Sequence, residues 1–197
     1  MQNRHLDRRS YFNELATTSE AYYIPYLEKH IGKIVPGMKV LEIGCGEGGN
    51  LEPFAERGCE VTGVDIVKER TEQAKTFFAQ DGVEGTFICN DASKCEGFDG
   101  KFDIVLAHDV IEHVHDKPGF LSAALKFLRP GGHAFFGFPA WYMPFGGHQQ
   151  ICRSKFCSHA PFLHLLPMPL YRMTLENCNV KEKDVLELMD IRETRTT

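Results

Sequence analysis

The sequence predicts an α/β fold, a three-layer sandwich in which helices cover both faces of a doubly wound, mostly parallel sheet. Two observations support this prediction. Between residues 37 and 138, short apolar runs alternate with longer amphipathic runs, a pattern typical of parallel strands joined by right-handed helical crossovers. A glycine-rich turn at residues 44–49 follows the first apolar run, and in such sheets ligands bind at the carboxyl ends of the strands.

The first 36 residues are expected to form a helical cap ahead of the sheet. Residues 9–34 have helical patterning, and Pro25 should bend or restart the helix because proline lacks a backbone N–H. The core, residues 37–138, is then expected to hold five strands with helices between them. The strands are expected at 39–43, 60–64, 85–89, 102–107 and 133–138, and the helices at 50–57, 67–79 and 120–128.

The pattern changes after residue 138. Residues 139–180 contain five prolines and many aromatic side chains, so we expect an insert that packs as a small core or lines an acceptor pocket. Residues 181–197 are expected to give a helix at 181–189 and a short strand at 190–196. The length of 197 residues fits a single domain that includes all of these parts.

Composition and charge exclude several classes of protein. The chain is 43% hydrophobic and 25% charged, which rules out a mainly disordered chain. Lys plus Arg number 22 and Asp plus Glu number 27, a formal charge of −5 that argues against a nucleic-acid partner held by bulk charge. No apolar run approaches the ~20 residues of a membrane span, and the polar segment 1–10 is not expected to be a secretory signal. Seven irregularly spaced cysteines are expected to be reduced thiols in a cytoplasmic protein.

Three acidic residues at the ends of successive strands indicate a ligand. The turn at 44–49 fits the dinucleotide pattern G-x-G-x-x-G, but Glu42 would repel a pyrophosphate and suits a cationic or amine-bearing ligand. Asp65, about 20 residues further on, can accept both hydroxyls of a ribose, and Asp91 can accept from an adenine amino group. For each carboxylate taken alone, a role as a helix N-cap is as good an explanation as ligand binding. The three together, at the ends of successive strands, favour ligand binding.

This segment resembles the class I, Rossmann-like, seven-stranded methyltransferases that depend on S-adenosylmethionine. The motifs that carry the resemblance are, in order, Glu42–Gly46, Asp65, Asn90–Ala92 and Leu128–Gly132. It is similar to the type 11/12 methyltransferase-domain group, which includes ubiquinone-pathway O-methyltransferases. The resemblance implies S-adenosyl-L-methionine as the cofactor and S-adenosyl-L-homocysteine as its product.

The resemblance also implies a role for each motif residue. Glu42 and Gly44 would surround the methionine amino group, while Asp65 would hold the ribose. Ile66 would cover one face of the adenine, and residues 91–92 would meet its edge. The expected cofactor-binding residues are Glu42, Gly44, Cys45, Gly46, Asp65, Ile66, Asp91, Ala92 and His108.

His108 and the segment after it are expected to carry the reaction. His108 would lie beside the methyl group, where contact with the cofactor or backbone and contact with the acceptor remain equal alternatives. Asp109, Glu112 and His113 have spacings that converge on one face of a turn. The pattern is similar to the acidic-x-x-Glu-His segments that bind a divalent cation in ubiquinone-pathway O-methyltransferases and small-RNA 2′-O-methyltransferases. The RNA enzymes add a later histidine, for which His148 is the candidate.

Several roles for this segment stay open. A divalent metal would use Asp109, Glu112, His113 and His148, but none is favoured, because relatives usually carry glutamate where Asp109 stands. Without a metal, His113 would act as a base or make a structural hydrogen bond. The expected catalytic residues are His113, His108 and His148.

The predicted function is methyl transfer to an oxygen or nitrogen of a small, apolar or planar acceptor, because aromatic residues follow the fifth strand. The alternatives are an RNA-end 2′-O-methyltransferase with a divalent metal and a non-catalytic cofactor-binding module. A nicotinamide-dependent oxidoreductase is disfavoured by Glu42. The family fold ends with strands six and seven, which are expected to be incomplete here. An exposed sheet edge would then favour a homo-oligomer through strand pairing.

Overall fold

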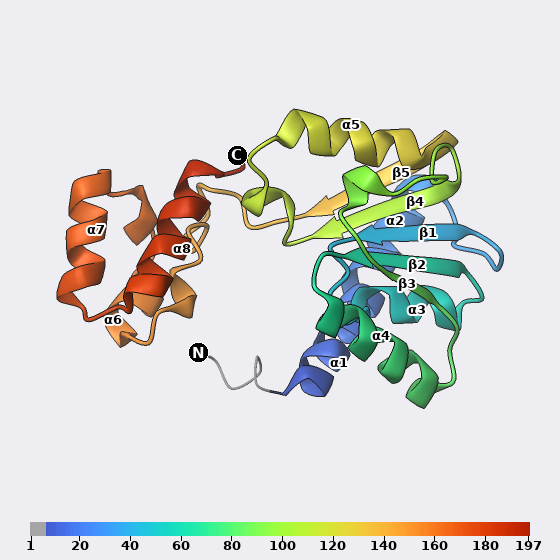
Figure 1. Cartoon of the computed structure of the whole chain (residues 1–197), viewed down its shortest axis with the longest axis horizontal. Helices are drawn as coiled ribbons and strands as arrows, with labels where there is room; N and C mark the ends of the chain where they lie inside the picture. Colours follow the sequence, from blue (N-terminus) through green and yellow to red (C-terminus); the bar gives the residue numbers. More distant parts are fainter. Residues whose placement is uncertain (1–6) are drawn as a thin grey trace. The chain divides into compact units, whose positions relative to one another are not determined.

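The computed structural model describes residues 7–197, so the first six residues of the expected helical cap and of the 1–10 segment lie outside the described residues. The described residues gather into two compact units (Figure 1). We call residues 7–108 and 117–137 the sheet unit, and residues 109–116 and 138–197 the helical unit. Whether the chain is a single domain therefore stays a prediction.

The sheet unit contains five parallel strands in the order β3-β2-β1-β4-β5 (Figure 1). Their positions confirm the doubly wound α/β prediction. The order runs from β1 through β2 to β3 on one side and from β4 to β5 on the other, so it reverses between β1 and β4. The strands are β1 (Lys39–Ile43), β2 (Glu60–Asp65), β3 (Thr86–Cys89), β4 (Phe102–His108) and β5 (Leu128–Gly137).

The last strand begins five residues earlier than the sequence predicted. Residues 130–132 lie inside β5 as an irregularity, because Phe102 pairs with Leu128 while Ile104 pairs with His133. Gly131 has φ +79°, a conformation that glycine adopts without strain. This irregularity therefore interrupts the strand without ending it.

Helices cover both faces of the sheet. Pro25 lies in the first turn of α2, after a π-helix, so the expected restart of the N-terminal helix is confirmed. Right-handed crossovers put α3 and α4 on one face and α5 on the other, because the strand order reverses. The helical elements are α1 (Arg8–Thr18), the π-helix η2 (Ser19–Tyr23), α2 (Ile24–Ile31), η3 (Gly49–Leu51), α3 (Glu52–Glu56), α4 (Lys68–Asp81), η4 (Ala92–Lys94) and α5 (Lys117–Phe127).

The main core lies between the sheet and the helices α1 to α4. Phe12, Leu27, Phe54 and Phe78, one from each helix, are buried there against apolar strand side chains. The strand residues of this cluster are Val40, Val61, Phe87, Ile104 and Leu106. This burial fixes the strand ends that carry the predicted site.

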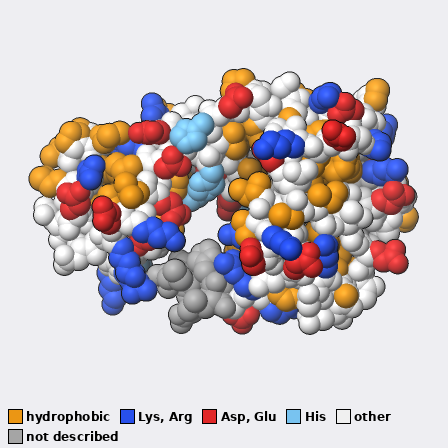
Figure 2. All heavy atoms as spheres, in the orientation of Figure 1, with side chains coloured by type: hydrophobic (Ala, Val, Ile, Leu, Met, Phe, Trp, Pro, Cys, Tyr) orange, Lys and Arg blue, Asp and Glu red, His pale blue; other side chains and the backbone are white. Residues whose placement is uncertain are grey.

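The helical unit has a core of its own. Tyr171, Leu175, Val185 and Leu188 are buried together with Cys157, so residues on both sides of the expected boundary at 180 share one core. Hydrophobic side chains also lie on its surface (Figure 2). Its elements are η5 (Ile111–His113), η6 (Gln149–Ile151), α6 (Lys155–His159), η7 (Leu163–Leu165), α7 (Met168–Asn177) and α8 (Glu182–Glu193).

The expected strand at residues 190–196 is wrong, because α8 continues through Glu193. Ile191 is 2% exposed and continues the apolar stripe of Val185 and Leu188 at helical spacing. Burial of this side chain therefore extends the helix beyond the polar Asp190. The described part of the chain contains five strands, and β3 and β5 are the edges of its sheet. Among residues 7–197, none of the helices has the length and apolar character that crossing a membrane requires.

Candidate functional site

The carboxyl edge of the sheet gathers most of the predicted ligand-binding residues. Glu42 of β1 is in register with Leu106 of β4, and His108 ends β4 two residues later. Asp65 ends β2, and Asp91 follows β3 by two residues. The reversal of strand order lies between β1 and β4, and such a reversal is where doubly wound sheets bind ligands.

Glu42 is a carboxylic acid buried at this edge. Its side chain is 1% exposed, and its Oε1 accepts a 2.7 Å hydrogen bond from Nδ2 of Asn50. Its Oε2 is buried without a hydrogen-bond partner. Burial raises the pKa of Glu42 from 4.5 to about 8, with a smaller contribution from the charge of Asp65. The free protein therefore holds a neutral acid that a ligand cation can convert to a carboxylate.

The glycine loop after β1 is open at one position and closely packed at others. Gly46 has φ +52°, and a Cβ there would meet nothing within 4 Å, so a ligand can approach the backbone. A Cβ on Gly48 would lie 2.8 Å from the ring of Phe87, and one on Gly49 would lie 2.4 Å from the backbone oxygen of Phe12. Two of the glycines are therefore explained by packing.

Asp65 ties this loop to the end of β2. Its Oδ2 accepts a 2.9 Å hydrogen bond from the backbone N–H of Gly46, and its Oδ1 accepts one of 2.8 Å from that of Val67. The side chain is 6% exposed. Ile66, next to it, is 74% exposed, so an apolar side chain stands at the same edge beside the acid.

Two other predicted residues make local structural contacts. Asp91 is the N-cap of η4 and accepts hydrogen bonds from the backbone N–H and hydroxyl of Ser93, which lower the pKa of its carboxyl group. Ala92 is the first residue of that turn. The thiol of Cys45 lies in the main core, where burial raises its pKa, so Cys45 offers a ligand its backbone only.

A second group of predicted residues comes together within the helical unit. One ligand atom from each of Glu112, His113 and His148 lies within 4.8 Å of the others, a geometry that could hold a metal ion. Nε2 of His148 is 3.6 Å from Oε1 of Glu112, and the rings of His113 and His148 are 5.6 Å apart. Asp109 is not one of the three, although its charge acts on His148.

The protonation of His148 suits a metal. Burial, followed by the neighbouring His113, lowers the pKa of His148, so its imidazole is neutral at pH 7 and can donate a lone pair. Glu112 is 2% exposed, and a buried carboxylate is stabilised by a cation. The donor set of one carboxylate and two imidazoles fits a divalent transition metal or zinc.

The end of the chain holds this group in place. The hydroxyl of Thr194, just after α8, donates to the backbone oxygen of Glu112. Nε2 of His115 lies 3.1 Å from Oδ1 of Asp190 on α8. The extension of α8 that replaces the expected strand therefore fixes the backbone of the Glu-His segment.

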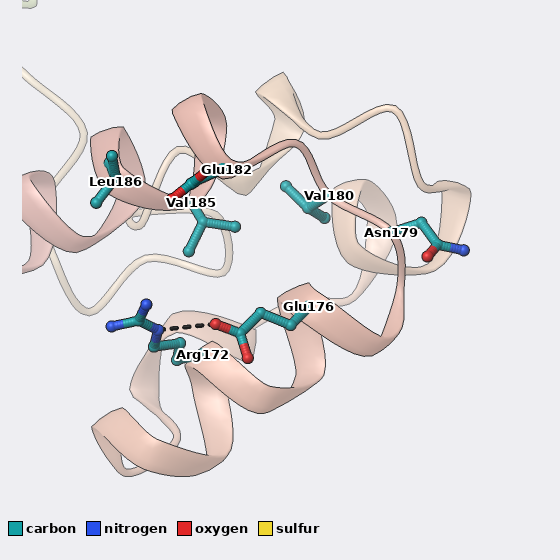
Figure 3. A pocket seen from close by; sticks show the side chains of 7 residues that line it. All are labelled: Arg172, Glu176, Asn179, Val180, Glu182, Val185 and Leu186. Atoms are coloured by element: carbon teal, nitrogen blue, oxygen red, sulfur yellow. Dashed lines mark hydrogen bonds and ion pairs between the residues drawn. The ribbon is translucent and has the colours of Figure 1, made fainter.

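A surface cavity of about 440 Å³ lies elsewhere in the helical unit, between α7 and α8 (Figure 3). The ion pair between Arg172 and Glu176, 2.8 Å long, stands at its side (Figure 3). None of the predicted site residues lines this cavity. The residues that do are Arg172, Glu176, Asn179, Val180, Glu182, Val185 and Leu186.

Sequence reasoning missed two residues that shape these sites. Asn50 holds Glu42, and Thr194 holds the backbone of Glu112. Tyr23 packs its ring 5.5 Å from that of His108. A polar residue in the first turn after the glycine loop was a usable signal for Asn50. No local pattern marks Thr194, because its partner is 82 residues away.

Replacing Glu42 with glutamine is expected to stabilise the free protein increasingly as the pH rises. The native acid has a pKa raised from 4.5 to about 8, so its stabilising contribution is full below pH 4.5 and is lost as the pH rises towards 8. Linkage gives a loss of about 2 kcal/mol between pH 5 and 7 in the wild type. Glutamine stays neutral and keeps an oxygen for Asn50.

Urea unfolding of the wild type and Glu42→Gln at about pH 5 and 7 measures this difference. Glu84→Gln changes an exposed glutamate before β3 and serves as the control that should follow the wild type. An advantage of Glu42→Gln that is the same at both pH values would contradict the raised pKa.

Comparisons with known proteins agree on one family for the sheet unit. Residues 41–136 match the family model described as "Methyltransferase domain". A ubiquinone biosynthesis O-methyltransferase of Proteus mirabilis is 34% identical over 121 residues, which cover 58% of this chain and 49% of the relative. The chain thus spans about half the length of the curated relatives it matches.

Solved structures show the same fold. The PH0226 protein from Pyrococcus horikoshii OT3 superposes with a TM-score of 0.51 at 30% identity, covering 64% of this chain and 57% of that one. A magnesium protoporphyrin IX methyltransferase from Synechocystis PCC 6803 with bound SAM gives a TM-score of 0.50 at 24% identity, covering 57% and 54%. At this identity, the similarity to the Synechocystis enzyme shows a shared fold only. The match over residues 41–136, together with these relatives, supports a methyltransferase domain of the class I, S-adenosylmethionine-dependent type 11 group in this part of the chain.

Proposed function

We propose that this chain transfers a methyl group from S-adenosylmethionine to an oxygen or nitrogen of a small, apolar or planar acceptor. The observation that carries the proposal is the buried Oε2 of Glu42, which has no hydrogen-bond partner at the carboxyl end of β1. An unpaired buried carboxyl oxygen costs free energy. A ligand ammonium group removes that cost and leaves a buried ion pair.

The cofactor fits the residues at the sheet edge. The methionine ammonium group would pair with Glu42, and the open backbone at Gly46 would let the cofactor approach the loop. The ribose hydroxyls would donate to the lone pairs of Asp65 that its two backbone bonds leave available. The exposed side chain of Ile66 would cover the adenine, whose amino group would reach the turn at 91–92.

Methyl transfer needs little covalent chemistry from the protein. A lone pair of the acceptor attacks the methyl carbon, the new C–O or C–N bond forms, and the C–S bond breaks with its electrons left on sulfur. The acceptor's proton passes to a base, and His108 at the end of β4 is the group we assign to it. Positioning and exclusion of water supply the rest of the rate enhancement.

The curated relatives support oxygen as the accepting atom. The matched proteins are named ubiquinone biosynthesis O-methyltransferases, and we carry the oxygen preference to this chain as part of the proposal. A formal charge of −5 offers no bulk attraction for RNA, so we prefer the small-molecule acceptor to an RNA end.

We propose in addition that Glu112, His113 and His148 bind a divalent cation. The supporting observation is the convergence of their ligand atoms within 4.8 Å in the helical unit. A bound cation supplies Lewis-acid polarisation of an oxygen. The chain itself holds the two imidazoles and the carboxylate within 4.8 Å of one another.

Asp65→Asn is expected to weaken binding of S-adenosylhomocysteine by 1.5–3 kcal/mol, or about 10- to 150-fold, because one charged acceptor of the ribose hydroxyls is lost. Calorimetric titration measures the change. Asp99→Asn alters an exposed surface ion pair with Lys126 and is the control that should bind like the wild type. An affinity unchanged in Asp65→Asn would contradict the ribose role.

The affinity for S-adenosylhomocysteine is expected to rise between pH 6 and 8 by up to ~10-fold per pH unit, because Glu42 must lose its proton to pair with the ammonium group. The pKa of about 8 in the free protein sets the upper limit of this range. Titrations in two buffers of different ionisation enthalpy count the proton released. In Glu42→Gln the pH dependence should disappear, and its persistence there would show that another group is responsible.

Manganese(II) is expected to bind the wild type, and His148→Ala should weaken that binding at least ~10-fold because one of three ligands is lost. Calorimetry or the paramagnetic relaxation of water measures it. His159→Ala removes an exposed histidine of α6 outside the group and should bind as the wild type does. Equal manganese affinity in all three proteins would rule out a metal at this group.

A further inference from the structure

A row of aromatic rings lies on the sheet unit where β4 and β5 end. The ring of Tyr23 is 5.5 Å from that of His108 and 5.1 Å from that of Phe135, at interplanar angles of 48° and 49°. Tyr26 extends the row, with its ring 5.8 Å from that of Phe135. Tilted rings at these separations are in favourable aromatic contact.

Tyr23 belongs to a π-helix that is hydrogen-bonded to the residue beside Glu42. Tyr23 is the last residue of the π-helix η2, and π-helical turns are rare and frequently found at functional sites. The hydroxyl of Ser19, at the start of η2, donates to the backbone oxygen of Asn50, the residue that holds Glu42. The π-helix is therefore bonded to the neighbourhood of the cofactor acid.

The imidazole ring of His108 lies against Gly137. A Cβ on Gly137 would lie 3.0 Å from Cδ2 of His108, so a larger residue would require the ring to shift by a few tenths of an ångström. Gly137 is also the register partner of His108. The end of β5 thus supports the ring on one side, while Tyr23 contacts it on another.

These rings stand next to the residues assigned to the cofactor. Leu106 is in register with Glu42, and His108 points to the same face of the sheet as Leu106 because side chains alternate along a strand. The accepting atom must come within about 3–3.5 Å of the methyl carbon. An acceptor in this position would contact the rings, of which Tyr23, His108 and Phe135 are half-buried and Tyr26 is 54% exposed.

We propose that Tyr23, His108 and Phe135 form an acceptor subsite that takes a planar aromatic ring and directs its oxygen or nitrogen to the methyl group. The assignment rests on the proposed methyltransferase function and adds the residues that recognise the acceptor. It places recognition on the sheet unit, whereas the sequence favoured the aromatic residues of the 139–180 insert. Aromatic side chains select planar partners, because offset or edge contacts need a flat π-face.

Matched probes test the subsite on the full chain saturated with S-adenosylhomocysteine. The planar probe is 2-naphthol, and its saturated counterpart is decahydro-2-naphthol, which keeps the hydroxyl but has no π-face. Binding is followed by NMR titration. We expect 2-naphthol to bind more tightly, and Tyr23→Leu or Phe135→Leu to weaken it about three- to tenfold. Tyr23→Phe should restore binding because it keeps the ring.

Two control variants show whether the effect is specific to the rings of the proposed subsite. Tyr22→Leu removes the neighbouring ring of the same π-helix, which is 69% exposed, and should leave 2-naphthol binding unchanged. Tyr142→Leu removes an aromatic ring of the insert that is 70% exposed and should do the same. Weaker binding in Tyr142→Leu together with unchanged binding in Tyr23→Leu would overturn the proposal.

The cofactor titration separates this subsite from the proposed function. S-adenosylhomocysteine should bind Tyr23→Leu and the wild type equally; a matching loss of its affinity would mean that Tyr23 covers the cofactor, and the subsite would be wrong. A wild-type chain that binds no S-adenosylhomocysteine would contradict the proposed function itself. Unfolding curves of each variant show whether the fold is intact.

Discussion

The buried carboxyl group of Glu42 is the constraint around which the cofactor edge is organised. Folding removes this acid from water and leaves one of its oxygens without a hydrogen-bond partner, which is unfavourable unless a ligand completes the pairing. The side chain of Asn50 donates a hydrogen bond to the other oxygen, and the backbone oxygen of Asn50 accepts one from the hydroxyl of Ser19 in the π-helix. The acid, the first turn after the glycine loop and the N-terminal helices are thus linked through one residue. A buried polar group without a hydrogen-bond partner lowers the stability of the free protein, and such groups are typical of binding sites.

Much of the fold was predictable because the apolar runs of buried parallel strands are short and bounded by glycine and proline. The four strands β1 to β4 lie within one residue of their expected ends. The errors fell where tertiary contacts decide the structure. Helix α8 extends further than expected because Ile191 is buried in the helical unit. Strand β5 begins earlier than expected because its pairing with β4 continues on both sides of the proline-glycine turn, with a shift of register.

In the candidate site too, local sequence patterns predicted some placements, while others depended on tertiary contacts. The placement of Glu42 and Asp65 at one edge of the sheet was predictable because the carboxyl ends of parallel strands lie along the same edge. The convergence of His148 with Glu112 and His113 required the fold, since 35 residues separate His148 from His113 in the sequence. Thr194 escaped prediction because its partner, Glu112, is 82 residues away and no local spacing identifies it.

The two units carry different chemistry. The sheet unit holds the acids assigned to the cofactor and the aromatic rings assigned to the acceptor. The helical unit holds a carboxylate and two imidazoles that converge within 4.8 Å, and Thr194, just after α8, donates to the backbone oxygen of Glu112. Since the chain spans about half the length of its curated relatives, cofactor binding is the property that the described residues support most directly.

The measurement that tests this account most directly is a calorimetric titration of the wild-type chain with S-adenosylhomocysteine, with NADH titrated in parallel. We predict micromolar binding of S-adenosylhomocysteine, about −8 kcal/mol, and no binding of NADH, which has no ammonium group to pair with Glu42. Binding of NADH alone, or of neither compound, would contradict the assignment of the buried acid to the cofactor's ammonium group.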